Sequence, residues 1–286
     1  MEQQQNLSIL ERIHASYYQL TATEKKVADY VLAHSNQVQF MSITQLADEC
    51  GTADASISRF CRSLKLKGFN AFKLELAQHS AAHTASQAPV SATDPDTLEG
   101  RCRKTGRLMQ EAVIQTVELV HPDTISKVVD LFESGNQILC MGSGGSMIMA
   151  QECAHLFSTV SGKFHALGDS HLQMSAVAIM DPRDVVVLFS YSGATTGGLQ
   201  ILELARQRGI QTILVTRYPK SPAANLADIV LCCGSNESPM QIGSVYAKVA
   251  QLVIMDMLYQ EYRHRNKAQC DENLKCIADS LSGMHV

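Results

Sequence analysis

The chain has 286 residues, of which 45% are hydrophobic and 18% charged, and its formal net charge is −4 at pH 7. This ordinary globular composition excludes a largely disordered chain and a collagen. At roughly 100–200 residues per domain, the length predicts two folded units. No apolar run approaches the roughly 20 residues that span a bilayer, and the polar start MEQQQNLS is unlike a signal peptide. We therefore expect a soluble, cytoplasmic protein.

Residues 81–97 have the composition of a linker. The stretch from His79 to Asp96 holds small polar residues, two prolines and almost no large apolar side chain. Upstream of it, apolar residues recur at three- and four-residue spacing, which predicts an all-α domain over residues 1–80. The second domain is expected to occupy residues 98–286.

The segment 43–64 has the spacing of a helix-turn-helix. Gly51 stands where a tight turn needs a left-handed backbone, and Ile57 follows where the second helix needs an apolar residue against the first. Phe60 continues the same core face three residues later. The pattern therefore predicts a second helix over about 53–64, with its opposite face turned outward.

The outward face of this second helix carries side chains that hydrogen-bond base edges or phosphates. Between residues 55 and 75 there are five basic residues and one acid, so the segment is locally positive although the chain is negative. The candidate DNA-binding residues are Ser56, Ser58, Arg59, Arg62 and Lys65 at this helix, with Ser42 and Thr44 at the start of the helix before it. The alternative is a helical hairpin that packs against a protein, with the arginines as its solvated face.

Beyond the linker, short β-branched runs alternate with helical stretches. Continuous apolar runs of this kind are typical of parallel strands that are buried on both faces. The expected strands are 137–142, 184–190, 211–216 and 228–233, with a shorter one near 163–166. Crossover helices are expected at 146–160, 196–208 and 242–262. The sequence thus predicts an α/β/α sandwich around a five-stranded parallel sheet.

Two loops rich in serine and glycine follow the first and third of these strands. The loops are 142-GSGGS-146 and 190-SYSGATT-196, and each leads into a helix, whose N-terminus attracts phosphate. In a parallel sheet both loops emerge at the carboxyl edge. We therefore expect them to converge on one anion through the hydroxyls of Ser146, Ser190, Ser192 and Thr195. For either loop alone, helix capping and tight turning would explain the same residues.

Neither loop matches a dinucleotide-binding or Walker motif. Nine cysteines include no C-x-x-C pair, which favours free thiols. The nearest metal-binding pattern, His79-x3-His83, has no second pair of ligands nearby. The sequence therefore predicts no metal and no cofactor.

Several motifs in order carry a resemblance to a known family. They are 51-GTADASISRFCRSLKLKGF-69, GSGGS, 168-GDSH-171, SYSGATT, 221-SPAANLADIVL-231, 236-NES-238 and 245-VYAKVAQLVIMDMLY-259. The second domain resembles the SIS (sugar isomerase) fold, and the whole chain is similar to RpiR-type bacterial transcriptional regulators. The resemblance implies a regulator, expected to be a repressor, that binds operator DNA and senses a phosphorylated sugar. The ligand-binding residues that it implies are Ser143, Gly145, Ser146, Ser190, Ser192, Gly193 and Thr195 in the two loops, with His171 and Glu237 close to the sugar.

The chain departs from the family pattern at three places. Ala53 replaces a frequent serine at the start of the recognition helix, so Asp54 or Thr52 is expected to cap it. Lys65 replaces a frequent glycine, which adds charge and is expected to lengthen the helix. The second loop lacks the acid that commonly follows its glycine, which leaves the identity of the sugar open.

The same fold also serves aldose-ketose sugar-phosphate isomerases. Such an enzyme needs a base to move a proton between adjacent carbons and an acid to open the ring, roles open to Glu237, His171 and Asp169. An isomerase has no need of a DNA-reading domain, so we expect a regulator and no enzyme.

A homodimer or homotetramer is expected, because two recognition helices fit a near-palindromic operator. The helix expected at 98–120 carries the apolar residues Leu108, Val113, Val117 and Leu119. This helix is expected to join subunits or to cover the sheet.

Overall fold

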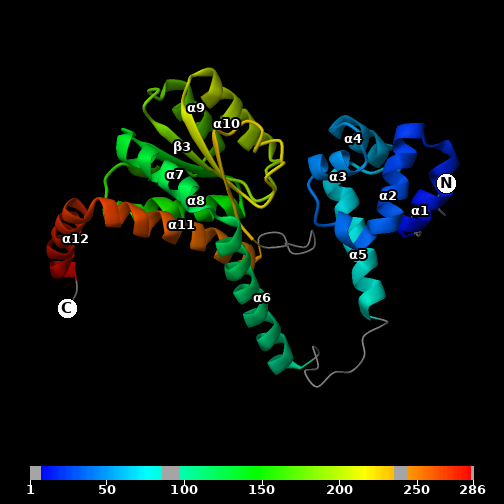
Figure 1. The fold of residues 1–286 in the computed structure, drawn as a ribbon, viewed down its shortest axis with the longest axis horizontal. Helices are drawn as coiled ribbons and strands as arrows, with labels where there is room; N and C mark the ends of the chain where they lie inside the picture. The colour runs from blue at the N-terminus through cyan, green and yellow to red at the C-terminus, as the bar shows by residue number, and fades with distance from the viewer. Residues whose placement is uncertain (1–7, 86–96, 235–243, 285–286) are drawn as a thin grey trace. The chain divides into compact units, whose positions relative to one another are not determined.

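A computed structural model describes residues 8–85, 97–234 and 244–284 (Figure 1). The chain divides into two compact units, and the division between them falls after Gly106. Within the described ranges, no helix has the length and apolar character to cross a membrane.

The N-terminal unit is built from helices, as the sequence predicts. They are α1 (Ile9–Ser16), α2 (Ala22–Val38), α3 (Ile43–Glu49), α4 (Asp54–Ser63) and α5 (Phe69–Ala85), with a short 3-10 turn at Tyr17–Gln19. Capping boxes start the first three, with Ser8, Thr21 and Ser42 as the N-cap residues. Because α5 continues to Ala85, the first residues of the predicted linker are helical.

The core of this unit lies among α1, α2, α3, α4 and α5. Ile57 and Phe60 of α4 are fully buried, which confirms the inward face expected from the sequence. The Phe60 ring packs edge-on against Phe72 of α5, with ring centroids 5.6 Å apart. Burial of this apolar face fixes α4 by one side and leaves the opposite side exposed.

The C-terminal unit is a parallel α/β sandwich. Its strands are β1 (Ile138–Gly142), β2 (Phe164–Ala166), β3 (Val185–Phe189), β4 (Gln211–Thr216) and β5 (Ile229–Cys232), in the spatial order β2-β1-β3-β4-β5. Every neighbouring pair is parallel. The helices of this part of the chain are α6 (Leu98–Leu119), α7 (Pro122–Ser134), α8 (Gly145–Ser158), α9 (Ser170–Ile179), α10 (Thr196–Gln207), α11 (Val245–Arg265) and α12 (Lys267–Leu281). All five expected strands are confirmed within two residues at each end.

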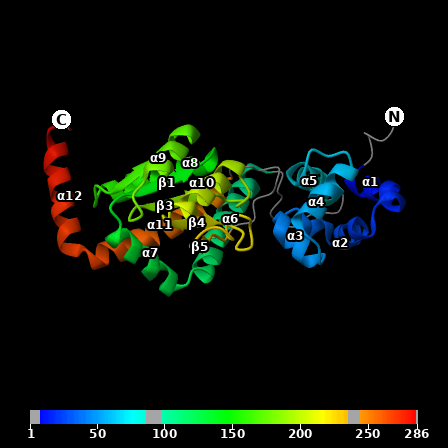
Figure 2. The same cartoon turned by 90° about the horizontal axis from the view of Figure 1, so that it is seen from above.

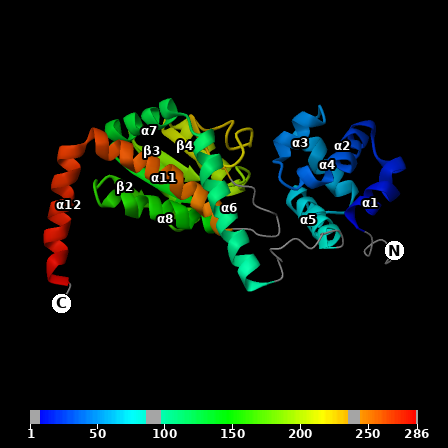
Figure 3. The same cartoon turned by 60° about the horizontal axis from the view of Figure 1, so that its bottom comes forward.

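Side chains of the central strands alternate between two cores. Val187 and Phe189 of β3 point to the face covered by α7, α8 and α11, whereas Val186 and Leu188 point to the face covered by α9 and α10. Figure 3 shows α11 lying along the sheet between α7 and α8, and Figure 2 shows the layers from above. Burial on both faces explains why the strands read as continuous apolar runs.

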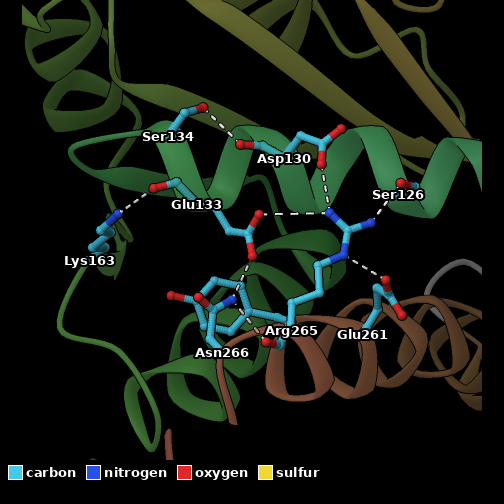
Figure 4. Close-up of polar contacts among 9 residues, drawn as sticks. Ser126, Asp130, Glu133, Ser134, Lys163, Glu261, Arg265 and Asn266 are labelled. Carbon is cyan, nitrogen blue, oxygen red and sulfur yellow. Dashed lines mark hydrogen bonds and ion pairs between the residues drawn. The ribbon is translucent and has the colours of Figure 1, made fainter. Parts of the chain in front are cut away.

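Polar contacts of Arg265 tie the end of α11 to α7 (Figure 4). Its guanidinium donates to Asp130 and Ser126 of α7, each at 2.6 Å, and to Glu261 one turn earlier at 2.7 Å. Asn266 donates to Glu133 at 2.8 Å in the same cluster. The chain turns here from α11 into α12, so the cluster holds the C-terminal end of α11 against α7 at this turn.

Candidate functional site

Helices α3 and α4 form the helix-turn-helix. Gly51 has φ of +60°, the left-handed conformation expected at this turn. The turn is closed by hydrogen bonds from Gly51 N to the Asp48 carbonyl at 3.0 Å and from Thr52 N to the Ala47 carbonyl at 2.9 Å. The prediction of a helix-turn-helix at 43–64 is therefore confirmed.

The outward face of α4 presents two arginines. Arg59 and Arg62 are exposed, Ser58 is half-buried, and Lys65 is exposed just beyond the helix. Arg59 Nη2 donates to Ser56 Oγ at 3.1 Å, which orients this guanidinium along the helix. The arrangement offers cationic donors on one side of a helix that is anchored on the other, as insertion into a major groove requires.

Ser56 does not lie on this outward face, contrary to the sequence prediction. Its residue is only 5% exposed. It precedes Phe60 by four residues, so it shares the side of the helix that Phe60 buries. The prediction erred because a small polar side chain was assigned to the solvent face by residue type.

Ser42 and Thr44 use their hydroxyl groups inside the motif. Ser42 is 4% exposed and caps α3 by accepting from Gln45 N at 3.1 Å. Thr44 Oγ1 donates to Asp54 Oδ2 at 3.0 Å, which joins the start of α3 to the start of α4. Both residues therefore stabilise the helix-turn-helix itself, and a phosphate contact by either one stays a prediction.

Both ends of α4 differ from expectation. The N-cap residue is Ala53 itself, without a side-chain cap, so neither Asp54 nor Thr52 takes that role. The helix ends at Ser63, and Lys65 has φ of +62°, so Lys65 does not lengthen it. A lysine here adopts the left-handed conformation that glycine adopts without strain.

In the C-terminal unit, the two serine-glycine loops leave neighbouring strands. Gly142 at the end of β1 pairs with Phe189 at the end of β3, so the loops begin side by side. From there α8 turns to one face of the sheet and α10 to the other. This is the switch point of a parallel sheet, where ligands bind in α/β proteins.

A shallow hollow that is open to solvent lies at this switch point. It is lined by Gly142, Ser143, Ser146, Leu188, Phe189, Ser190, Thr195, Gly198 and Ile201. Ser190 is 5% exposed, and its Oγ has no hydrogen-bond partner among the residues that the structure describes. Since a buried hydroxyl without a partner is destabilising, this atom marks a place where a polar ligand fits.

The loop from β1 to α8 is held close to the strand. A Cβ on Gly142 would lie 2.8 Å from the Ser146 carbonyl carbon, so only glycine fits. Gln173 of α9 donates through Nε2 to the Gly142 carbonyl at 3.0 Å and to the Leu167 carbonyl at 2.7 Å. Sequence reasoning missed Gln173, because nothing in its local pattern distinguishes a buried glutamine from a solvated one.

The loop from β3 to α10 is shaped by Gly193 and Ser221. Gly193 has φ of +60°, and a Cβ there would lie 2.0 Å from Ser221 Oγ. Ser192 Oγ accepts from Ala194 N at 3.3 Å, which makes it a turn-forming hydroxyl. Thr195 is exposed and is the N-cap residue of α10, and its side chain makes no cap hydrogen bond. Ser146, Ser190 and Thr195 thus meet at the hollow, whereas Ser192 and Gly193 support the loop behind it.

The remaining residues that the resemblance assigned to the ligand site differ in where the structure places them. Gly145 is the first residue of α8 and is half-buried. His171 is exposed on the first turn of α9 and does not line the hollow; its N–H donates to Asp169 Oδ1, the cap of that helix, at 2.9 Å. Glu237 lies outside the described residues.

Within the residues that the structure describes, no group of three or more His, Cys, Asp or Glu is placed to hold a metal ion.

Comparison with known proteins matches both units. Residues 7–83 match the model described as a helix-turn-helix domain of the rpiR family, and residues 131–261 match the SIS domain. An uncharacterized HTH-type transcriptional regulator from Caldanaerobacter subterraneus subsp. tengcongensis is 30% identical over 253 residues, which cover 88% of each chain. The chain belongs to the RpiR family of transcriptional regulators.

Solved structures share the fold of this RpiR-family regulator. The structure of the Vibrio vulnificus NanR protein, complexed with ManNAc-6P, superposes with a TM-score of 0.86 at 22% identity. The superposition covers 97% of this chain and 100% of the NanR chain. A putative sugar-phosphate isomerase from Listeria monocytogenes has a TM-score of 0.54 at 20% identity, over 58% of this chain and 88% of its own. At these identities the likeness establishes the fold alone. The regulator resemblance spans both units, whereas the isomerase resemblance covers little more than half of the chain.

Proposed function

We propose that this RpiR-family regulator binds a phosphorylated sugar at the switch-point hollow and that binding changes its affinity for operator DNA. The single observation that carries this proposal is the buried, unpartnered Ser190 Oγ at the hollow's wall. Ser146 and Thr195 add hydroxyls from the two neighbouring helix starts. Hydroxyls and N–H groups at helix N-termini bind a phosphate without a metal or a lysine. The NanR complex with ManNAc-6P supports the ligand class.

We further propose that the protein is a regulator without enzymatic activity. The hollow's described lining consists of glycine, serine, threonine and apolar residues, and it contains no histidine or carboxylate. Isomerisation needs a base and an acid at the sugar carbons. Of the three acid–base residues named from the sequence, Asp169 caps α9 and His171 does not line the hollow, whereas Glu237 lies outside the described residues. We therefore expect no sugar-phosphate turnover by the purified protein.

Regulation is proposed to act through an oligomer. Two copies of α4 would read half-sites about 34 Å or a multiple apart on a near-palindromic operator. Sugar phosphate would favour one arrangement of the subunits, with a coupling of about 1–3 kcal/mol, or roughly 5- to 150-fold in DNA affinity. We propose that the protein is a repressor and that ligand binding releases it from DNA.

Reciprocal variants test this division of labour. Ser190→Ala and Ser146→Ala should abolish the shift in melting temperature that a sugar phosphate produces, because the anion loses donors. The same variants should bind DNA from upstream of the gene normally and should no longer respond to ligand. A panel of hexose, pentose and amino-sugar phosphates in a thermal-shift assay identifies the ligand, and fluorescence anisotropy measures DNA affinity.

Arg59→Ala and Arg62→Ala form the opposite arm of this experiment. Each should weaken DNA binding about tenfold or more at low salt while the ligand-induced thermal shift stays intact. Arg206→Ala, which removes an exposed arginine at the end of α10, is the matched control for loss of charge. Serine variants that keep a full ligand response would place the phosphate elsewhere, and arginine variants that bind DNA like the control would refute the reading face.

A further inference from the structure

Gln173 is the buried polar residue on α9 that faces the back of the β1–α8 loop. It is 1% exposed, and the loop that it contacts contributes Gly142, Ser143 and Ser146 to the hollow. Its Nε2 lies within hydrogen-bond distance of two carbonyl oxygens, those of Gly142 at 3.0 Å and Leu167 at 2.7 Å. Because carbonyls only accept, the amide nitrogen must face them, and both of its hydrogens are used. Gln173 therefore joins the β1–α8 loop to the segment between β2 and α9.

The contact with Gly142 also fixes the orientation of a peptide group. No described peptide bond is cis, and in a trans peptide the N–H of the next residue points opposite to the carbonyl. With the Gly142 carbonyl turned toward Gln173, the Ser143 N–H is turned to the other side of the loop. If this peptide rotated, a carbonyl oxygen would replace a donor on that side, and an anion is repelled by a carbonyl oxygen.

We propose that Gln173 is a positioning residue for the anion site, which keeps the β1–α8 loop in the orientation that presents its N–H donors to phosphate. This inference rests on the proposed phosphate-binding function of the hollow. Gln173 itself does not line the hollow and acts through Gly142. The glutamine is thus part of the ligand site's preorganisation, which lowers the reorganisation needed on binding.

Gln173→Met tests the proposal, because methionine keeps the length and burial but cannot donate to either carbonyl. Two quantities are measured on the full chain: the Kd for inorganic phosphate by calorimetry, and amide hydrogen exchange of residues 142–146 without any ligand. We expect the phosphate Kd to rise about tenfold and exchange in the loop to accelerate by a similar factor. DNA binding without ligand should be unchanged, since α4 is not touched.

Thr212→Val is the matched control. Thr212 is also 1% exposed, and its hydroxyl also makes two hydrogen bonds, both with Asp228, at the amino end of β4 and so at the opposite edge of the sheet. The Thr212→Val variant should have a lower melting temperature than the wild type, with an unchanged phosphate Kd and unchanged amide exchange in the β1–α8 loop. If Gln173→Met does not fold, Gln173→Asn replaces it. The asparagine side chain is shorter by one carbon–carbon bond, about 1.5 Å, so its amide is too far from the two carbonyl oxygens to keep both hydrogen bonds.

The two measurements separate this inference from the proposed function. A wild-type chain that binds neither phosphate nor any sugar phosphate defeats the proposed function, while loop exchange still reports whether Gln173 orients the loop. Wild-type exchange and Kd in the Gln173 variant would overturn the positioning role. Equal effects in Gln173→Met and Thr212→Val would overturn it as well, because they would indicate a general loss of stability.

Discussion

At the scale of single residues, Glu24 shows how one carboxylate organises the DNA-reading unit. Its Oε2 accepts from Thr21 N and Oγ1 at the start of α2, at 2.9 and 2.8 Å, and its Oε1 accepts from Ser63 Oγ at the end of α4 at 2.6 Å. Burial raises the pKa of Glu24, but the hydrogen bonds from Ser63 and Thr21 outweigh it, so the pKa is lowered below its ordinary value of 4.5. The ionised carboxylate thus stabilises the start of α2 and the end of α4 more strongly than the protonated form does.

Glu24→Gln should destabilise the N-terminal unit by about 1–2 kcal/mol at pH 7, because the amide cannot accept all three hydrogen bonds as well. A lowered pKa in the folded state contributes stability above the unfolded pKa and loses it as pH falls through the folded pKa. The difference between wild type and variant should therefore stay constant from pH 8 to 5.5 and shrink below about pH 4.5. Hydrogen exchange of α2 and α4 amides measures it, and a difference independent of pH would contradict this role.

At the scale of elements, α4 and its C-terminal turn combine stability and recognition in one segment. Lys65 holds a left-handed conformation that glycine adopts without strain, and it is also one of the candidate DNA-binding residues. The chain thus keeps a positive charge at a position where its backbone favours glycine. Such local conflict is expected where function selects the residue.

Lys65→Gly should stabilise the turn after α4 by about 0.5–1 kcal/mol, because the strain is relieved. The same change should weaken DNA binding and reduce the magnitude of its salt dependence by about one phosphate contact. Exchange rates of α4 amides and DNA affinity at several salt concentrations provide the two readouts. Lys67→Gly, two residues on and also exposed, serves as the control for the loss of charge and for the backbone freedom that a glycine adds. A Lys65 variant that is less stable than this control would show that the lysine's own contacts matter more than backbone strain.

At the scale of the whole molecule, α6 carries an exposed apolar stripe. Ile114 is 57% exposed and Val117 53%, whereas Ala112 and Thr116 on the opposite side are buried. Val113 and Leu119 are also exposed, while Leu108 is half-buried. Adjacent exposed apolar side chains on one helix face are typical of an interaction surface. We propose that this stripe joins two copies of the chain, in line with the role suggested by its sequence.

Replacing both Ile114 and Val117 by lysine should convert a dimer to a monomer, because charge would be placed in an apolar contact. Sedimentation velocity measures the mass, and DNA affinity should fall with it, since two linked reading helices bind more tightly than one. Ile179→Lys on α9 changes an even more exposed apolar residue, 84% exposed, and should leave the mass unchanged. A double variant with the mass of the wild type would exclude α6 from the interface.

Elements with local sequence patterns could be predicted before the fold was known. Gly51, Ile57 and Phe60 specify the helix-turn-helix, and continuous apolar runs specify five buried parallel strands, because periodicity and backbone preference act over a few residues. The order of the two serine-glycine loops also sufficed to expect them at one edge of the sheet. Their residues carried the family resemblance that the comparisons then confirmed.

The burial of polar side chains and the identity of their contacts depend on the complete fold. Ser56 is buried, Ser190 is buried without a partner, and Gln173 is buried with both amide hydrogens bonded. The strand order, which makes β1 and β3 neighbours, likewise depends on contacts between residues far apart in the sequence. Burial and hydrogen bonding depend on residues far apart in the chain. No local pattern therefore distinguishes a serine that supports a loop from a serine that is available to bind a ligand.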